Sequence, residues 1–281
     1  MQSLARLPLV FACLLLGPLA VIAKEPHADT NKITSLTPEQ ARKLVATFKD
    51  GGLDLSHLTT LDADTAKALA EFKGQWLSLD GVTKLDADTA EALAEFKIQL
   101  LTLEGLKTLD TDTAQALAEF KGLGLSVNGV ITLDTDTAKA LAEFKGQGLY
   151  LNGLETADAG AFKELLALKA WVWNGHLPKL TSLDADTAKM LAANEKWNGR
   201  LPALTAFETH DSVAIAQALA TTKGPLSLPK LKKISPKTLT ALIEKRDVQI
   251  PLIETLELIQ EPDGSVTEDF VIPEWLKDRQ K

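Results

Sequence analysis

The stretch Leu61-Asp-Ala-Asp-Thr-Ala-Lys-Ala-Leu-Ala-Glu-Phe72 decides the fold, because the chain repeats it at a fixed step of 24 residues. Close copies of this stretch occupy residues 85–96, 109–120 and 133–144. A unit of this length cannot bury its apolar face alone, so neighbouring units must stack and share a continuous core. The sequence therefore predicts a repeat array rather than one globular core.

Each copy of the repeated stretch predicts a short helix. Asp62 stands where its carboxylate can accept a backbone N–H of the first helical turn. Other units place Thr37-Pro38 or Ser235-Pro236 in the same slot, and proline is favoured at the first position of a helix. The apolar residues recur at spacings of three, which predicts one buried helix face, formed in this unit by Ala66, Leu69 and Phe72.

A strand of period two follows each predicted helix. Gly74 is expected to end the helix. Leu77 and Leu79 then face one side, whereas Trp76 and Ser78 face the other. One strand cannot pair within its own unit, so we expect it to pair in parallel with the strand 24 residues away.

The pattern Leu-x-Leu-x-Gly-Val-x-x-Leu followed by a helix resembles the leucine-rich repeat family, and specifically its bacterial exported members. Residues 77–85, 101–109 and 149–154 carry the resemblance. It implies an α/β solenoid, with a parallel sheet of about nine short strands on one face and helices on the other. The chain departs from the family at the usual asparagine of the turn, where glycines stand instead, at Gly81, Gly105, Gly129 and Gly153.

The predicted solenoid covers residues 34–256, because one apolar strand position can be followed through nine units, from Leu55 to Leu252. Residues 24–33 are polar and are expected to form a loose N-terminal segment. Residues 257–281 contain further apolar side chains and are expected to form a C-terminal cap or tail. A cap is needed because an open end of an array exposes apolar surface and an unpaired strand edge.

Residues 1–23 are predicted to be a signal peptide. Arg6 precedes an apolar run that ends in small residues, and cleavage is expected after Ala23. Cys13, the one cysteine of the chain, leaves lipidation as an alternative. The chain is therefore expected to be secreted or periplasmic, without membrane insertion after signal removal. Its net charge of −8 argues against nucleic acid as a partner.

Strand residues that point away from the predicted core differ between units, whereas the helix and core letters hardly change. In leucine-rich-repeat proteins this open face commonly binds ligands, so the resemblance implies a binding site there. Aromatic and arginine side chains contribute strongly to protein interfaces. An aromatic ring flanked by asparagines also suits carbohydrate. We predict a surface that recognises a protein or a glycan, formed by Trp76, Leu100, Asn128, Tyr150, Asn152, His176 and Arg200.

Two kinds of chemistry compete with simple binding. The aspartate pairs that begin the helices suggest calcium, but a calcium loop needs more oxygen ligands, and Thr37 and Ser235 replace the acid elsewhere. Capping is therefore favoured, and no metal or cofactor is predicted. Asp80 and Glu104 lie on neighbouring predicted strands, and paired carboxylates can hydrolyse glycosides.

The chain is nevertheless predicted not to be an enzyme. The four histidines lack metal-ligand spacing, and no Gly-x-Ser-x-Gly motif occurs. The main alternative to a binding protein is a structural repeat protein of the cell envelope without a dedicated site.

Overall fold

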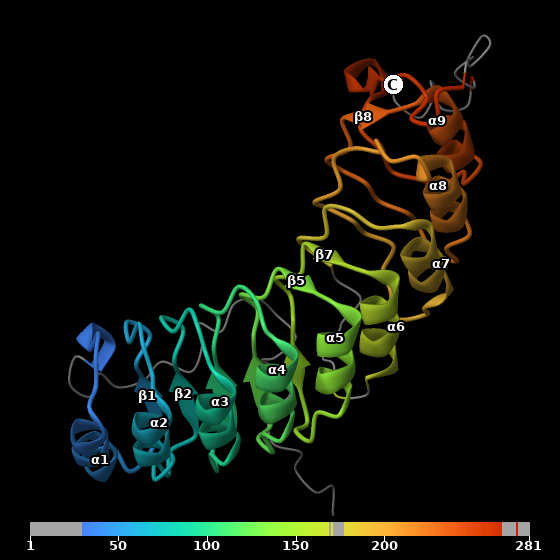
Figure 1. Ribbon diagram of the computed structural model, residues 1–281. Coiled ribbons are helices and arrows are strands. Elements are labelled where there is room, and N and C mark those ends of the chain that lie inside the picture. The colour runs from blue at the N-terminus through green and yellow to red at the C-terminus, as the bar shows by residue number, and fades with distance from the viewer. Residues whose placement is uncertain (1–29, 169, 171–176, 266–273, 275–281) are drawn as a thin grey trace, which may run out of the picture. The chain divides into compact units, whose positions relative to one another are not determined.

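The computed structural model in Figure 1 describes residues 30–168, 170, 177–265 and 274 as a mixed α/β protein. The signal peptide predicted at residues 1–23 and most of the segment 24–33 lie outside the described residues. Turns of 3-10 helix occupy Thr30–Lys32 and Ile253–Thr255. The described α-helices are α1 (Pro38–Thr47), α2 (Ala63–Leu69), α3 (Ala87–Ala94), α4 (Thr111–Ala118), α5 (Thr135–Ala142), α6 (Ala159–Ala167), α7 (Ala185–Ala193), α8 (Ser212–Ala220) and α9 (Pro236–Ile243).

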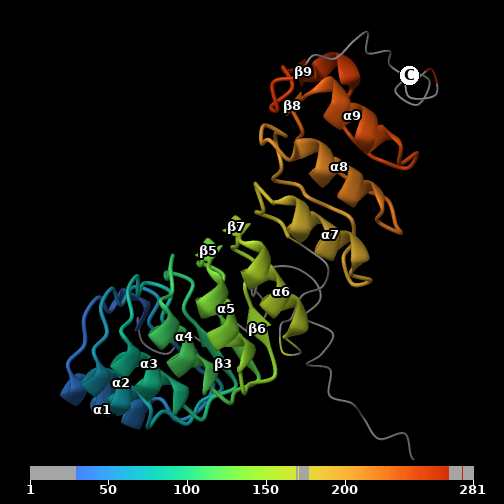
Figure 2. The same ribbon diagram turned by 45° about the vertical axis from the view of Figure 1, so that its right-hand side comes forward.

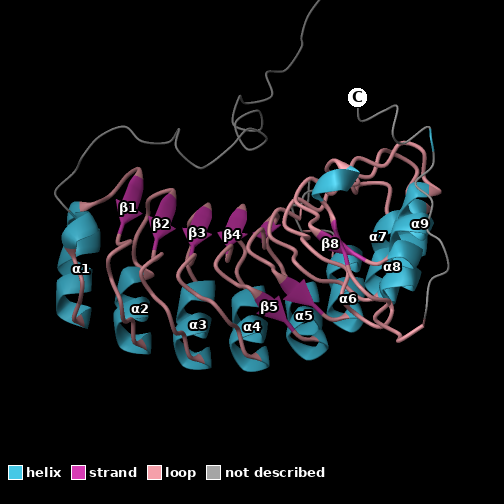
Figure 3. Cartoon of the chain, turned by 90° about the horizontal axis from the view of Figure 1, so that it is seen from above, coloured by secondary structure: helices cyan, strands magenta, loops and turns pink. Residues whose placement is uncertain are grey.

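Five short strands form one parallel sheet in the order β1-β2-β3-β4-β6. Each residue pairs with the residue 24 positions later, as Leu53 does with Leu77. The strands lie in a row on one side of their units, and the helices lie on the other (Figure 3). The predicted parallel pairing between consecutive units is therefore confirmed for β1 (Gly52–Asp54), β2 (Trp76–Ser78), β3 (Leu100–Thr102), β4 (Gly124–Ser126) and β6 (Leu149–Tyr150).

Among the described residues, the sheet has five strands rather than the predicted nine or so. Beyond β6 the described units pair through single parallel bridges, which join Ser227 to Arg200 and to Gln249. The residues before the bridge are unsuited to a strand, because Gly199 precedes Arg200 with a φ of 72° and Pro225 stands two residues before Ser227. Proline has no N–H to donate to a ladder, so it shortens the paired stretch. In Figure 2 the helices α7, α8 and α9 of these later units still lie side by side.

A second set of parallel pairs lies where the chain enters the helices, and the sequence analysis did not predict it. The strand β5 (Thr132–Leu133) pairs with β7 (Thr156–Ala157), and β8 (Lys233–Ile234) pairs with β9 (Glu257–Leu258). A single bridge joins Ala206 to Lys233 in the same way. Several neighbouring units are thus joined by backbone hydrogen bonds both before and after the turn.

Side-chain oxygens fix the start of the described α-helices, as predicted, except at α8, where Asp211 makes no capping bond. Asp62 accepts the backbone N–H of Thr65 at 2.7 Å. Thr37 forms a reciprocal capping box with Gln40 at the start of α1. The same capping bond is made at the helices that follow Asp86, Asp110, Asp134, Asp158, Asp184 and Ser235. The aspartates that begin these helices therefore act as caps.

The cap of α6 also joins two units. The Asp158 carboxylate accepts the Ala161 N–H at 2.6 Å and the Thr135 hydroxyl at 2.8 Å. The bond from Ala161, supported by Thr135, lowers the pKa of Asp158 below its ordinary value of 3.8 although partial burial acts in the opposite direction. Because the folded-state pKa is lower than the unfolded one, this stabilisation is complete above the unfolded pKa. It is lost as the pH falls through the folded pKa.

We expect Asp158→Ala to lower the free energy of unfolding by about 1 kcal/mol at neutral pH. Denaturant titrations at a series of pH values should show this difference shrinking as the pH falls below 3.8. Glu143→Ala is the control. Glu143 is exposed at the C-terminal end of α5, far along the helix from Thr135, so its loss should change stability little. A difference that grows at acid pH would contradict this assignment.

The helices end earlier than predicted, and Gly74 has a different role. The helix α2 ends at Leu69, and Gly74 does not adopt the left-handed backbone of a helix cap. A Cβ atom at Gly74 would lie 2.1 Å from Cζ of Phe72, whose ring is buried. Glycine fits this position because the phenylalanine of the same unit folds back over the chain, although Ile98 occupies the same position one unit later. The same contact occurs at Gly122 with Phe120 and at Gly146 with Phe144.

The turn glycines allow the backbones of adjacent units to approach closely. A Cβ atom at Gly129 would lie 1.9 Å from the carbonyl oxygen of Glu104 and 2.4 Å from that of Leu106. Comparable contacts with the preceding unit occur at Gly81, Gly105 and Gly153. The obstacle is backbone, which cannot move aside as a flexible side chain does. These glycines therefore set how closely the units stack.

We expect Gly129→Ala to destabilise the chain by about 1–3 kcal/mol, because the added methyl group pushes two units apart. Gly224→Ala is the matched control, since a Cβ atom there would meet nothing within 4 Å. The measurement is the free energy of unfolding in urea. Equal stability of the two variants would show that the close approach at Gly129 is not needed.

The beginning of the predicted C-terminal cap lies against the last described helix. The strand β9 pairs with β8, and Glu261 is 5% exposed. Glu261 accepts the backbone N–H of Lys237, in the first turn of α9, at 2.9 Å. Residues 266–273 and 275–281 lie outside the described residues, so a cap formed by the whole of residues 257–281 stays a prediction.

Candidate functional site

Three large side chains lie on the outward face of the five-stranded sheet. Trp76 and Leu100 are register neighbours on β2 and β3, whereas Tyr150 on β6 is in register with Ser126 of β4 and stands two residues further along the strands. All three are half-buried. We call Trp76, Leu100 and Tyr150 the apolar row.

Glycines make room for the apolar row. A Cβ atom at Gly52 would lie 1.7 Å from Cε2 of Trp76, so the indole leans over the neighbouring strand. A Cβ atom at Gly124 would lie 3.0 Å from Cδ1 of Leu100 and 3.2 Å from Cε2 of Tyr150. Leu100 and Tyr150 therefore flank Gly124. Leu100 and Tyr150 thus approach each other across Gly124, whereas the Trp76 indole leans the other way, over β1.

A line of polar side chains, which we call the polar ladder, runs beside the apolar row. Its members are Asp80, Glu104, Asn128 and Asn152. Asp80 Oδ1 accepts the backbone N–H of Glu104 at 3.0 Å, and Asn128 Oδ1 accepts that of Asn152 at 2.8 Å. In both cases a side chain satisfies the backbone of the next unit, at the same position of the repeat. The ladder therefore supplies side-chain oxygens for turn N–H groups.

The hydroxyl groups between the row and the ladder are mostly enclosed. Ser126 is 1% exposed, and its Oγ donates to Glu104 Oε1 at 3.0 Å. Ser78 Oγ donates to Asp80 Oδ2 at 2.9 Å. Thr102 is also buried, although it faces the same side of the sheet. Ser78 and Ser126 therefore support the ladder, whereas Thr102 Oγ1 is buried and makes no hydrogen bond within the described residues.

The structure brings together some of the predicted site residues and not others. Trp76, Leu100 and Tyr150 lie on the same face of the sheet, and Asn128 and Asn152 lie beside them. Asn128 differs from the prediction because its amide is already bonded within the ladder. Asn152 is exposed. His176 lies outside the described residues. Arg200 is exposed. It pairs with Ser227 through a single bridge and is not part of strands β1, β2, β3, β4 or β6.

The two alternative chemistries find no matching arrangement among the described residues. Asp80 and Glu104 are held by hydrogen bonds in the ladder, where Glu104 Oε1 accepts from Ser126 and from Asn128. No cluster of histidine, cysteine and acidic side chains in the described part of the chain is arranged to hold a metal ion. The helix-starting aspartates instead bind backbone N–H groups, as described above.

Tyr150 is the single tyrosine of the chain, which makes its environment directly measurable. Burial raises the pKa of the Tyr150 phenol above its ordinary value of 10.0, because the ionised form loses hydration. The phenol is therefore neutral at physiological pH. It presents an aromatic edge and a hydroxyl group to a partner.

We expect an ultraviolet titration of tyrosinate to show one transition, with its midpoint above 10.0. The Leu100→Ala variant should move this midpoint back toward 10.0, because Leu100 flanks the same glycine as the ring. Circular dichroism recorded across the titration must show that the protein stays folded. A midpoint at or below the ordinary value in the folded protein would contradict the half-buried position of Tyr150.

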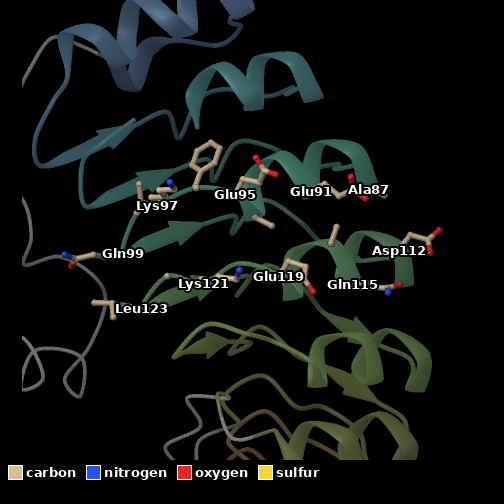
Figure 4. A pocket seen from close by; sticks show the side chains of 15 residues that line it. Ala87, Glu91, Glu95, Lys97, Gln99, Asp112, Gln115, Glu119, Lys121 and Leu123 are labelled. Carbon is tan, nitrogen blue, oxygen red and sulfur yellow. The ribbon is translucent and has the colours of Figure 1, made fainter. Parts of the chain in front are cut away.

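A groove between α3 and α4, away from the apolar row, is a second candidate site that the sequence analysis missed. Its volume is about 1170 Å³ (Figure 4). Acidic side chains from the two helices and two lysines from the connections to the strands line it, among them Glu91, Glu95, Asp112, Lys97 and Lys121. The one feature of the sequence that could have pointed to this groove is Ile98. It lines the groove and stands where the neighbouring units have glycine.

The helices were also compared with the requirements of a membrane span. Among the residues that the structure describes, no helix is both long enough and apolar enough to cross a bilayer.

Comparison with known proteins leaves the family open. No protein-family model and no curated protein matches the chain. Among solved structures the chain is similar to a chain of the crystal structure of the Rad7 and Elc1 complex in yeast, with 12% sequence identity and a TM-score of 0.24. That match covers 80% of this chain and 88% of the other. The functional inference therefore depends on the residues of the strand face.

Proposed function

We propose that this chain is an exported, leucine-rich-repeat-like solenoid that binds a protein or glycan ligand on its strand face. The apolar row is the observation that carries the proposal. Three large, half-buried side chains from separate units lie on one face, and glycines beside them leave their sides uncovered. Aromatic side chains in such positions contribute more binding energy than most surface residues.

The contrast between repeated and unrepeated positions supports the same proposal. Packing and capping account for the residues that recur from unit to unit, since these residues are buried or accept hydrogen bonds from helix N–H groups. Stacking alone does not require a tryptophan at residue 76 or a tyrosine at residue 150, because Gly124 and Gly148 serve at similar outward positions. The large side chains at these two positions therefore fit a role in recognition.

A binding role is favoured over catalysis at this face. The carboxylates of Asp80 and Glu104 accept hydrogen bonds that join consecutive units. A carboxylate fixed in this way is poorly placed to donate a proton or attack a substrate. Export to the periplasm or the medium is part of the proposal and follows from the signal-peptide pattern in residues 1–23.

The polar ladder favours one alternative, a structural envelope repeat without a dedicated site. Its bonds connect consecutive units, and they stabilise the array whether or not a ligand binds. In that case the side chains of the apolar row are dispensable. The two functions therefore differ in what truncation of Trp76 and Tyr150 should do.

The deciding experiment is affinity capture and glycan-array binding with the wild-type chain and the Trp76→Ala/Tyr150→Ala variant. We expect the variant to lose at least about tenfold in affinity for any ligand of this face, because two aromatic anchors are removed. Its unfolding free energy should change by less than its affinity, because both side chains are half-buried.

Leu258→Ala is the matched control, since Leu258 is 48% exposed and lies on β9, outside the five-stranded sheet. This variant should bind like the wild type. Ligand binding that ignores the double substitution would overturn the proposal and favour the structural alternative.

A further inference from the structure

The polar groups at the centre of the strand face are already bonded to one another. The Asn128 amide donates to Glu104 Oε1 at 3.1 Å and to Ser126 Oγ at 2.8 Å, while its carbonyl oxygen accepts from the next unit. Glycan recognition needs directed hydrogen bonds from free donors and acceptors to many hydroxyl groups. The centre of this face offers few of them, so glycan is the weaker of the two ligand classes.

Two kinds of interaction remain available on the face. One is apolar contact with Trp76, Leu100 and Tyr150. The other is negative charge, from Asp54, Asp80 and Glu104, all of which are partly exposed. A carboxylate that accepts a backbone N–H keeps its charge, and attraction to a cation does not require that the hydrogen bond be broken.

No basic side chain stands at the outward strand positions that surround these acids. The outward residues of β1, β2, β3, β4 and β6, and those that directly follow them in the ladder, include no lysine or arginine. Lys97 and Lys121 lie before β3 and β4 in sequence, whereas Asp80 and Glu104 follow β2 and β3. The acids therefore occupy the carboxyl ends of the parallel strands, and these lysines precede the amino ends.

We propose that the ligand of this face is a cationic amphipathic segment of another protein, which places apolar side chains on the apolar row and lysine or arginine beside Asp54, Asp80 and Glu104. This inference rests on the proposed binding function of the strand face and names its ligand class. Charge complementarity selects the partner, because a row of acids without cations attracts basic segments and repels acidic ones.

The dimensions of the face set the length of the segment. Trp76 and Tyr150 lie on strands separated by three strand spacings, or about 14 Å. A helix rises 1.5 Å per residue, so about ten helical residues cross this distance. The partner segment therefore needs two or three helical turns, with its apolar and basic residues on adjacent sides.

The test uses a synthetic helical peptide of leucine and lysine, about 14 residues long so that it exceeds the span, with the full chain and isothermal titration calorimetry. We expect it to bind, and we expect binding to weaken as NaCl rises from about 50 to about 300 mM. The counterpart with glutamate in place of lysine should bind at least about tenfold more weakly.

The variant Asp54→Asn/Asp80→Asn/Glu104→Gln removes the charge of the face and keeps one acceptor oxygen at each position. At residue 80 the bond with Ser78 Oγ must reverse, so that the amide N–H donates to the hydroxyl. We expect about tenfold weaker binding of the leucine–lysine peptide and a reduced salt dependence. The control Glu71→Gln/Glu91→Gln/Glu143→Gln removes the same charge from exposed acids elsewhere and should leave the affinity almost unchanged. Thermal unfolding of both variants checks that the fold is kept.

Failure of this inference is distinguishable from failure of the proposed function. Equal binding of the peptide to both triple variants, equal binding of the acidic counterpart, or no peptide binding would overturn the cationic ligand class. If the Trp76→Ala/Tyr150→Ala variant at the same time loses binding of a neutral oligosaccharide, the strand face remains a binding site for glycan. If the aromatic substitutions affect no ligand, the proposed function fails as well.

Discussion

Close approach of one unit's backbone to the next is the constraint on which the structure depends. Parallel pairing at a step of 24 residues requires the turns to stack within contact of the preceding carbonyl groups, and Gly81, Gly105, Gly129 and Gly153 leave room for that contact. The alanine-rich helices satisfy the same condition on the other side, since small side chains let neighbouring helices pack closely. The recurring letters of the sequence serve this stacking.

The stacking also determines where the chain is free to vary. Inward strand residues such as Leu53, Leu77 and Leu101 are fully buried, so their identity is fixed by the core. Outward residues are not needed for the core, but the polar ladder uses some of them to satisfy the backbone of the next unit. What remains for recognition is therefore narrower than the whole strand face, and consists of the apolar row and the charge of the ladder.

The candidate site could be predicted from the sequence only in part. Period two and the repeat placed Trp76 and Leu100 side by side, because adjacent units are related by a simple 24-residue shift. The meeting of Tyr150 with Leu100 could not be predicted, since it depends on how far two side chains reach across Gly124. The engagement of Asn128 within the ladder was also hidden, because its partners lie in the units before and after it. The groove beside Ile98 arises from packing between two helices and leaves only a single-letter change in the repeat.

The sequence by itself determined the unit, its helix caps and the parallel partner of each early strand, since capping is local and the repeat fixes which residues face each other. Only the tertiary structure decided that the described part of the sheet has five regular strands, that the helices end before their glycines, and that Asp80 and Asn128 bond to the next unit. The physical reason is that these features depend on distances between units. Proline, a folded-back phenylalanine ring and a side-chain oxygen each act on a neighbour whose position follows from packing and not from the local order of residues.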